Sequence, residues 1–454
     1  MNALIVIFIT GLLSLFIAFA KKPLLVLITA CAGLVTAAIL LAQQWGLETP
    51  QSLFKYKGLL FDHNAIGYSL VAILFAFLAI LAGYKSFKEN EEHIGDYVAL
   101  LLFSLVGAMC MVSYTDLFMF FLGLEILSIP IYVMAGTKKK DVRSSEASIK
   151  YFLTGAFATG VLLFGIAWLY GAVGSFDINV IGMKINLEAS HSSLLYVGLL
   201  LILAAFLFKV GAAPFHFWSP DVYSGSPSIV TGYMAAVVKI GAFGAFIKLF
   251  TVCFPSLHEF WAPALAGLAI LTMFVGNLSA LSQITFKRLL AYSSITHVGY
   301  ALLTILSTDG GSQFNLLFYL FAYGFSIISL ITISMLLNDE EDKIEAFKGL
   351  GKRHPFLGFV AILALLSLAG VPPLVGFFGK YLVFAGAISE FPTLVVIAII
   401  NSGIGIYYYL KTIMTVVSKD DVSEAKIEVT GIQYFVLVVC ALGLLLGGLF
   451  ASHV

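Results

Sequence analysis

The chain has 454 residues, of which 60% are hydrophobic and 11% are charged, and its mean hydropathy is +1.02. A soluble domain carries roughly 25% charged residues, so this composition excludes a protein with an ordinary water-facing surface. Lys plus Arg and Asp plus Glu both number 25, and a net charge of zero argues against a nucleic-acid partner. We predict an all-α, polytopic membrane protein with a single membrane domain over residues 1–454.

Long apolar segments follow one another along the chain and are separated by short polar loops. A membrane-spanning helix needs about 20 apolar residues. Because a bilayer offers no partners for free backbone N–H and C=O groups, such long apolar runs predict helices. We count 14 segments, at residues 3–20, 24–42, 64–84, 95–113, 115–135, 146–172, 194–216, 227–250, 260–280, 289–306, 312–337, 354–388, 392–417 and 430–452.

The distribution of cations supports this number of helices. Loops after odd-numbered helices hold 16 Lys and Arg residues, loops after even-numbered helices hold 3, and 6 lie inside segments. Cytoplasmic loops are enriched in Lys and Arg, so the loops after odd-numbered helices are predicted to be cytoplasmic and both termini to lie outside. The 16 are Lys21, Lys22, Lys85, Lys88, Lys138, Lys139, Lys140, Arg143, Lys287, Arg288, Lys343, Lys348, Lys352, Arg353, Lys419 and Lys426, and the 3 are Lys55, Lys57 and Lys184.

Two of the predicted helices are interrupted. Helix 7 ends in the sequence KVGAAP at residues 209–214, and helix 12 contains GVPP at 370–373. Proline removes a backbone donor, and in lipid such a break persists only where protein or trapped water satisfies the freed groups. Paired interrupted helices indicate internal repeats with a transport path between them. We predict two inverted five-helix repeats, helices 4–8 at 95–250 and helices 9–13 at 260–417.

One acidic residue lies at mid-depth in a predicted helix. The other 24 acids are in loops or at helix ends, whereas Glu125 is in the middle of helix 5. A charge at the centre of a membrane helix costs about 2.5–3.5 kcal/mol on insertion scales, so we predict that Glu125 has a role in transport. The alternative is a protonated Glu125 that links helices by hydrogen bonds.

Six lysines also lie inside the predicted helices. Lys209, Lys239 and Lys380 are too deep for their ammonium groups to reach the interface comfortably, and we predict functional roles for them. Lys150 is about one turn into helix 6, where a functional role and snorkelling are both open. Lys248 and Lys411 lie near helix ends and are expected to snorkel.

Lysines and histidines in a membrane interior suit proton transfer. Burial lowers the pKa of a lysine and a nearby carboxylate raises it again, so a buried lysine that gains and loses a carboxylate partner takes up and releases a proton. The same lysines would repel bare cations. His216 follows Lys209 by seven residues, and His297 lies in helix 10. Both are candidates because histidine titrates near neutrality, although hydrogen-bonded packing is the alternative for each.

Three motifs make the chain resemble a known family. They are GLEILSIP at residues 123–130, KVGAAPFHFWSPDVYSGSP at 209–227 and KRLLAYSSITHVGY at 287–300. These motifs resemble helix 5, the broken helix 7 with its following loop, and the start of helix 10 in the antiporter-like subunits of respiratory complex I. The resemblance covers nearly the whole chain.

Among the types in that family, the chain is most similar to the N type of bacterial proton-pumping NADH:quinone oxidoreductase. The sequence around Asp221, a lysine at position 380 and an end directly after helix 14 fit the N type better than the M or L type. The resemblance implies that Glu125 and Lys209 form an ion pair, that Lys239 is the central relay and that Lys380 is the exit-side lysine. It also places Lys150 and His216 on the same water-lined axis.

The resemblance implies a proton-translocating, non-redox subunit of an NADH:quinone oxidoreductase, driven by quinone reduction elsewhere in the complex. Its partners would be an M-type antiporter-like subunit, small K- and J-type subunits and the lipid of a bacterial inner membrane. The sequence has no nucleotide, flavin or iron–sulfur motif and its four cysteines are scattered. We therefore expect no cofactor in this chain, with flavin, iron–sulfur clusters and quinone in partner subunits.

Other readings of the same residues remain open. The chain resembles the subunits of Mrp-type sodium/proton antiporters and the membrane subunits of related hydrogenases as well. A passive scaffold is disfavoured by the buried charges.

Overall fold

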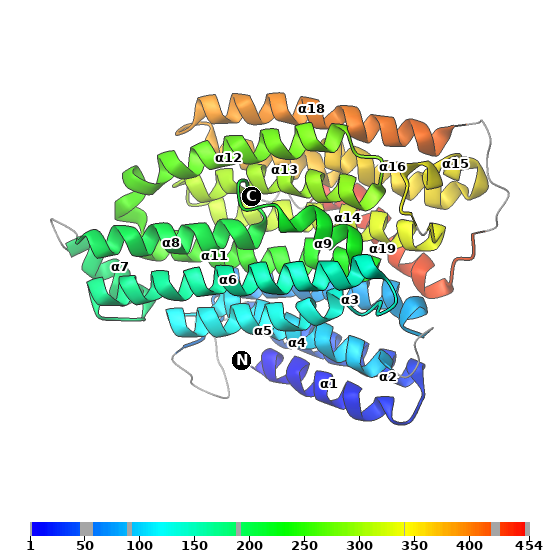
Figure 1. The fold of residues 1–454 in the computed structure, drawn as a ribbon, viewed down its shortest axis with the longest axis horizontal. Helices are drawn as coiled ribbons and strands as arrows, with labels where there is room; N and C mark the ends of the chain where they lie inside the picture. Colours follow the sequence, from blue (N-terminus) through cyan, green and yellow to red (C-terminus); the bar gives the residue numbers. More distant parts are fainter. Residues whose placement is uncertain are drawn as a thin grey trace.

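The computed structural model describes residues 2–45, 58–88, 93–187, 192–339, 341–418 and 427–449, and within these ranges the chain is built almost wholly of helices (Figure 1). Four of the cations in the topology argument, Lys55, Lys57, Lys419 and Lys426, lie outside the described residues, as do Met1 and residues 450–454 at the two termini.

The predicted number of membrane-crossing elements is confirmed. In the described ranges, 12 helices are long and apolar enough to cross a membrane. Adding the shorter α1 and the α16–α17 pair gives 14 crossings. The helices are α1 (Asn2–Ala18), α2 (Pro23–Trp45), α3 (His63–Lys88), α4 (Ile94–Ser113), α5 (Leu117–Ala135), α6 (Val142–Val173), α7 (Ile178–Leu187), α8 (Ser193–Val210), α9 (Trp218–Gly225), α10 (Ser228–Tyr233), the π-helical η2 (Met234–Val238), α11 (Lys239–Cys253), α12 (His258–Leu281), α13 (Phe286–Leu306), α14 (Ser312–Leu337), α15 (Leu350–Arg353), α16 (Pro355–Ala369), α17 (Val375–Ala387), α18 (Pro392–Val417) and α19 (Gly431–Leu446).

Both predicted breaks are present and share their local geometry. The first, between α8 and α9, begins at Gly211 (φ 79°), and the second, between α16 and α17, begins at Gly370 (φ 85°). Both glycines have left-handed backbone, which ends a helix without the steric cost that a Cβ would bring. A cis X-Pro peptide follows each, at Ala213–Pro214 and Pro372–Pro373.

Three short α-helices, α7, α9 and α15, were not predicted. Helix α9 resumes directly after the first break, although its sequence WSPDVYSG is polar. Helix α7 lies in the connection between α6 and α8 and buries Ile178, Ile181 and Ile185, which recur at helical spacing. At ten residues, α7 is too short to span a membrane, so a search for spanning segments does not find it.

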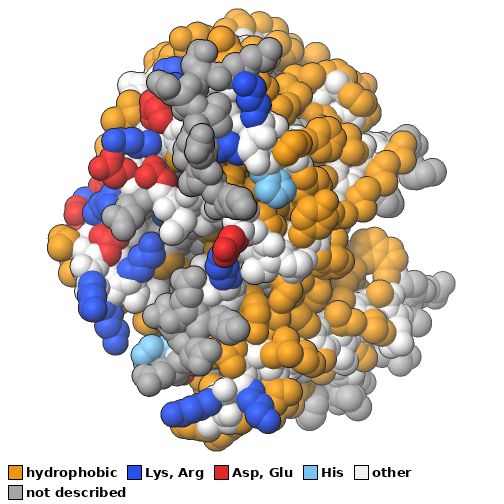
Figure 2. Space-filling model, turned by 90° about the vertical axis from the view of Figure 1, so that its right-hand side faces the viewer, with side chains coloured by type: hydrophobic (Ala, Val, Ile, Leu, Met, Phe, Trp, Pro, Cys, Tyr) orange, Lys and Arg blue, Asp and Glu red, His pale blue; other side chains and the backbone are white. Residues whose placement is uncertain are grey.

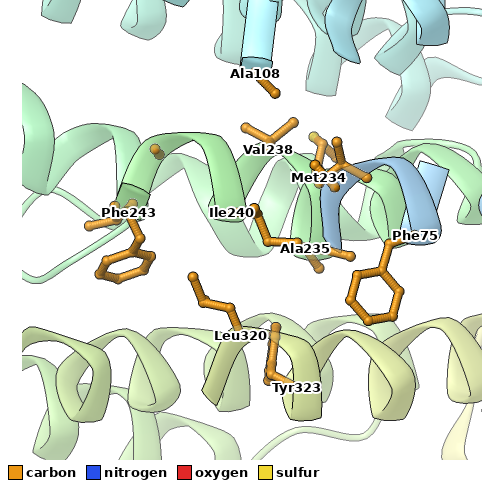
Figure 3. Packing of buried hydrophobic residues seen from close by; sticks show 14 of the residues in the cluster. Phe75, Ala108, Met234, Ala235, Val238, Ile240, Phe243, Leu320 and Tyr323 are labelled. Carbon is orange, nitrogen blue, oxygen red and sulfur yellow. The ribbon is translucent and has the colours of Figure 1, made fainter. Parts of the chain in front are cut away.

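The centre of the bundle is formed by α13 and α14, which are almost wholly enclosed by other helices. The π-helical turn η2 and the start of α11 pass between α4 and α14, with Val238 and Met234 directed toward Ala108 of α4 and Ile240 toward Leu320 of α14 (Figure 3). π-Turns inside α-helices are rare and are frequent at functional sites. This one ends directly before Lys239.

Charged side chains gather at one end of the bundle (Figure 2). This end, the right-hand side of Figure 1, is formed by the loops that follow the odd-numbered predicted helices and includes α15. We refer to it as the charged end. The exposed Lys21, Lys22, Lys138, Lys139 and Lys140 belong to these loops.

Candidate functional site

Lys209 lies at the end of α8, two residues before the first break. Its side chain is buried, 7% exposed, and Nζ donates to Ser128 Oγ of α5 at 2.6 Å. The Ser128 hydroxyl in turn donates to Leu124 O at 2.5 Å. Lys209 Nζ also lies 5.9 Å from the ring centroid of Tyr151. The first predicted lysine is therefore inside the bundle and directed toward α5, the helix that carries Glu125.

Glu125 is half-buried and accepts a hydrogen bond from Thr159 Oγ1 of α6 at 2.7 Å. Glu125 and Ser128 are three residues apart on α5, so they lie on one face of the helix. In the described structure the predicted ion pair between Glu125 and Lys209 is not a direct contact, because each group takes a hydroxyl partner instead. A space of about 10 Å³, close to the size of one water, is lined by Thr159 and Lys209.

Lys239 follows the π-turn and reaches the enclosed helix α13. Its Nζ donates to the Ser294 carbonyl at 3.1 Å and to the Ser294 hydroxyl, and it lies 5.5 Å from the ring centroid of Tyr323 on α14. The side chain is 7% exposed. The second lysine is thus at the centre of the bundle.

Lys380 is on α17, after the second break, and is 6% exposed. Its Nζ donates to Ala369 O at 3.0 Å and to Ser402 Oγ of α18 at 2.9 Å. The carbonyl of Ala369 belongs to the last residue of α16, where no intrahelical donor remains. Lys380 also lies over the ring of Tyr300, 5.3 Å from its centroid.

Polar side chains of α13 connect the surroundings of Lys239 with those of Lys380. Ser294, His297 and Tyr300 recur every three residues, so they follow one another along one side of the helix. Ser294 contacts Lys239 and Tyr300 contacts Lys380. His297 lies between them, buried, with Nδ1 2.5 Å from the hydroxyl of Tyr319 and Nε2 3.1 Å from that of Tyr409.

The sequence analysis named His297 as a candidate and did not identify its hydroxyl partners. Ser293 adds a further contact, with its hydroxyl 2.5 Å from that of Tyr409 on α18. The three-residue spacing within SSITHVGY was the available signal for Ser294 and Tyr300. Tyr319 and Tyr409 are 22 and 112 residues away from His297, and no sequence pattern connects them to it.

Lys150 and His216 are less enclosed than Lys209, Lys239 and Lys380. Lys150 is 42% exposed and forms ion pairs with Glu146 at 2.6 Å and with Asp221 of α9 at 2.7 Å. Arg288 of α13 contacts the other oxygen of Asp221 at 2.7 Å. His216 is half-buried between α8 and α9, and its ring lies 4.7 Å from that of Phe217. Neither of these two residues contacts a buried lysine in the described structure.

Comparisons with known proteins show the family of the chain. The family model described as NADH:quinone oxidoreductase/Mrp antiporter, TM matches residues 114–405, which is more than half of the chain. The chain belongs to this family. The matched residues extend from before α5 to within α18 and contain Glu125, Lys209, Lys239 and Lys380.

Individual members of the family match over nearly the full length. NADH-quinone oxidoreductase subunit N of Cytophaga hutchinsonii is 41% identical, with 99% of this chain and 98% of the relative covered. A chain of respiratory complex I from Thermus thermophilus, solved with bound aureothin, is 32% identical with a TM-score of 0.86, covering 99% of this chain and 97% of that one. A chain of the Mrp complex from Dietzia shares the fold, with a TM-score of 0.83 at 18% identity and 100% and 95% coverage.

Proposed function

We propose that this chain is the proton-translocating membrane subunit of a bacterial NADH:quinone oxidoreductase, equivalent to subunit N. The observation that carries the proposal is the burial of Lys209, Lys239 and Lys380, each held by a hydroxyl or carbonyl group, with Ser294, His297 and Tyr300 of α13 between the last two. A fourth buried lysine, Lys287, differs from them because it forms an ion pair with Asp342 at 2.9 Å. Buried charges are costly in a membrane interior, so a purely structural bundle would not retain them. The relatives named subunit N, and the structural match to a complex I chain, support the same assignment.

The proposed relay begins with Glu125 and Lys209. A carboxylate close to a buried ammonium favours the protonated lysine, and its withdrawal favours release of the proton. Glu125 and the Lys209 partner Ser128 lie on one face of α5, and a space of about one water is lined by Lys209 and by Thr159, the hydrogen-bond partner of Glu125. Movement of either side chain by a rotamer change, or one bridging water, would couple their charges. We assign Lys239 as the central relay and Lys380 as the exit-side lysine.

Lys150 and His216 are assigned as outer members of the same axis. Asp221, the partner of Lys150, is part of α9, the second half of the broken helix. In this position a change in the charge of Lys150 acts on α9 through an ion pair. His216 lies seven residues after Lys209 on the same broken element.

The proposal also covers the internal repeats of the chain, its orientation in the membrane and its partner subunits. The two repeats are residues 95–250 and 260–417, and the charged end faces the cytosol of a bacterium, with both termini on the periplasmic side. The energy comes from quinone reduction in other subunits, which hold the flavin and iron–sulfur clusters, so this chain acts without redox chemistry of its own. The expected neighbours are an M-type antiporter-like subunit and small K- and J-type subunits.

An Mrp-type sodium/proton antiporter subunit is the second candidate, and a subunit of a related membrane-bound hydrogenase is the third. The structural match to the Mrp complex is at 18% identity and concerns the fold alone. Three buried ammonium groups disfavour passage of a bare sodium ion, because like charges in a medium of low dielectric constant repel strongly.

The relay is tested at Glu125. Glu125→Gln keeps the shape and removes the charge, and we expect it to lose most proton pumping. Glu125→Asp keeps the charge on a shorter side chain and should retain part of the activity. Pumping is measured in vesicles that contain the assembled complex, at matched assembly levels. Glu259→Gln, which neutralises an exposed acid at the start of α12, is the matched control and should pump normally.

The alternative role for Glu125 is a neutral hydrogen-bond link to Thr159. In that case Gln would substitute well and Asp would do worse, because only the reach of the side chain would matter. Pumping by Glu125→Gln at the level of the unmodified protein would remove the ion-pair mechanism.

The orientation is tested separately. Tags inserted at Thr137–Lys140 and at Lys348 should be accessible from the cytosol, and tags at both termini from the periplasm. A cytosolic C-terminal tag would contradict the topology of 14 helices.

A further inference from the structure

A cavity lies at the charged end, away from Lys209, Lys239 and Lys380. It has a volume of about 370 Å³. The tips of α3, α14, α15 and α19 meet there, and its polar lining includes Lys85, Asn338, Arg353, Glu428 and Gln433. Two cations and one acid give the lining a net positive charge. A cavity of this size accommodates a group much larger than a single water.

The two cations of the cavity are incompletely paired. Arg353 Nη2 donates to Ala346 O at 2.6 Å, whereas the buried Nε has no hydrogen-bond partner in the structure. Among the described residues, the acid that Lys85 approaches is Glu428, at 4.0 Å, and that carboxylate is 88% exposed. A buried donor without a partner is uncommon and indicates a missing water, ion or ligand. An arginine and a lysine on one cavity are the side chains that phosphate groups bind.

An aromatic pair places the cavity at the level of lipid headgroups. Phe356, three residues after Arg353, stacks on Tyr434, the residue after Gln433, with ring centroids 4.4 Å apart. Tyr434 and its neighbour Phe435 are 45% and 51% exposed on the apolar surface of α19. Tyrosine side chains concentrate at membrane–water interfaces, where the ring is apolar and the hydroxyl is wet. On the α14 side, Met335, Leu336 and Leu337 give the cavity an apolar wall.

We propose that this cavity binds the phosphate headgroup of an anionic phospholipid, with Lys85 and Arg353 as the cationic partners. The phosphate accepts from the guanidinium of Arg353 and from Lys85 Nζ, and the amide of Asn338 is available to a glycerol headgroup, whereas Gln433 Oε1 already accepts from Thr430. The acyl chains extend along α19, whose outer face carries exposed apolar residues. The bound lipid fills the junction of four helix tips and holds α15 against α3 and α19.

The test measures binding of a fluorescent phosphatidylglycerol to the assembled complex in detergent, with phosphatidylcholine as the competitor lipid. One Lys or Arg near a membrane surface contributes on the order of fivefold to the binding of an anionic lipid. Lys85→Gln should therefore weaken binding by about fivefold, and Lys85→Gln combined with Arg353→Gln by about 30-fold. Lys85 is 41% exposed, so the single variant tests the site even if loss of the Arg353 contact to Ala346 impairs folding.

Lys139→Gln with Lys140→Gln removes two exposed cations from the same end of the molecule and is the matched control. It should bind phosphatidylglycerol as the unmodified complex does. Equal weakening in this control would show general surface charge and would overturn the site, as would unchanged binding in both cavity variants. Displacement of the lipid by inorganic phosphate at equal concentration would assign the cavity to a soluble anion instead.

Discussion

The two broken helices begin with the same backbone geometry but satisfy their free groups in different ways. In the first break the indole Nε1 of Trp218 donates to Phe208 O at 3.1 Å, near the end of α8. Phe208 O also accepts from Gly211 N at 3.0 Å, so this carbonyl has two donors without Lys209, and the ammonium of Lys209 reaches Ser128 on α5. In the second break no tryptophan takes this position among the described contacts, and Lys380 itself donates to Ala369 O at the end of α16.

This difference indicates that one buried lysine has a proposed role in proton transfer alone, whereas the other also stabilises a helix end. The last carbonyls of a helix lack partners within the helix and carry partial negative charge. Lys380 therefore stabilises the end of α16 in addition to its proposed relay role, whereas Lys209 is directed only toward the α5 side chains. Loss of the two lysines should have a common effect on transport and different effects on stability.

The largest expected effect is on proton pumping when either lysine is removed. Lys209→Ala and Lys380→Ala should both lose most pumping per electron while the complex still assembles. Only Lys380→Ala should also lower stability, by about 1–3 kcal/mol, because Ala369 O is left without a donor. Ser128 keeps its bond to Leu124 O when Lys209 is removed.

Pumping in vesicles and thermal unfolding of the purified complex separate the two effects. Lys411→Ala, an exposed lysine near the end of α18, is the control and should leave both measurements unchanged. Normal pumping per electron by Lys380→Ala would refute its role in the relay. Equal stability of the two variants would show that the contact with Ala369 contributes little.

The next effect concerns the glycines that begin the breaks. An alanine at either position must adopt a left-handed backbone, which costs about 1–2 kcal/mol. At Gly211 the added Cβ would have no neighbour closer than 3.8 Å, whereas at Gly370 it would lie 2.9 Å from Lys380 Cδ. Gly211→Ala should therefore lower stability alone, and Gly370→Ala should lower stability and pumping together.

Thermal unfolding and vesicle pumping are again the measurements. A loss of pumping in Gly211→Ala as large as that in Gly370→Ala would show that the backbone of both breaks, rather than the position of the Lys380 side chain, limits transport.

Much of the fold could be predicted from the sequence because a membrane imposes simple rules on length, polarity and loop charge. The number of helices, both breaks and the burial of Lys209, Lys239 and Lys380 follow from those rules. The partners of the lysines do not. Ser128 and Ser294 lie within the motifs, but their contacts with the lysines depend on how α5 packs on α8 and how α13 packs on α11.

Lys150 is a second example of a residue whose partner could not be predicted from the sequence. Its position one turn into a helix suits both a buried relay and a solvated end, and its ion-pair partner Asp221 is 71 residues away. The ion pair exists because the broken helix turns α9 toward α6, which no local pattern indicates. The short helix α7 escaped prediction for another reason, since its isoleucines pack against α11 and not along a membrane-spanning length.

The smallest effect concerns the indole that satisfies the first break. Trp218→Phe removes one of the two N–H donors to Phe208 O, the other being the backbone N–H of Gly211, while a ring remains to stack on Tyr151, whose centroid is 4.7 Å from that of Trp218 at an interplanar angle of 13°. Because Phe208 O keeps the Gly211 donor, we expect the loss of one ordinary hydrogen bond, about 0.5–1.5 kcal/mol. Trp168 is the matched control, because its buried Nε1 has no hydrogen-bond partner in the structure, so Trp168→Phe removes an N–H that satisfies nothing. Thermal unfolding should show a lower midpoint for Trp218→Phe and an unchanged or slightly higher midpoint for Trp168→Phe.

A double variant tests whether Lys209 also stabilises the end of α8. If the indole of Trp218 does so and Lys209 does not, Trp218→Phe combined with Lys209→Ala should be destabilised by no more than Trp218→Phe alone. A further loss in the double variant would mean that Lys209 also stabilises this helix end, and the contrast between the two breaks would then not hold.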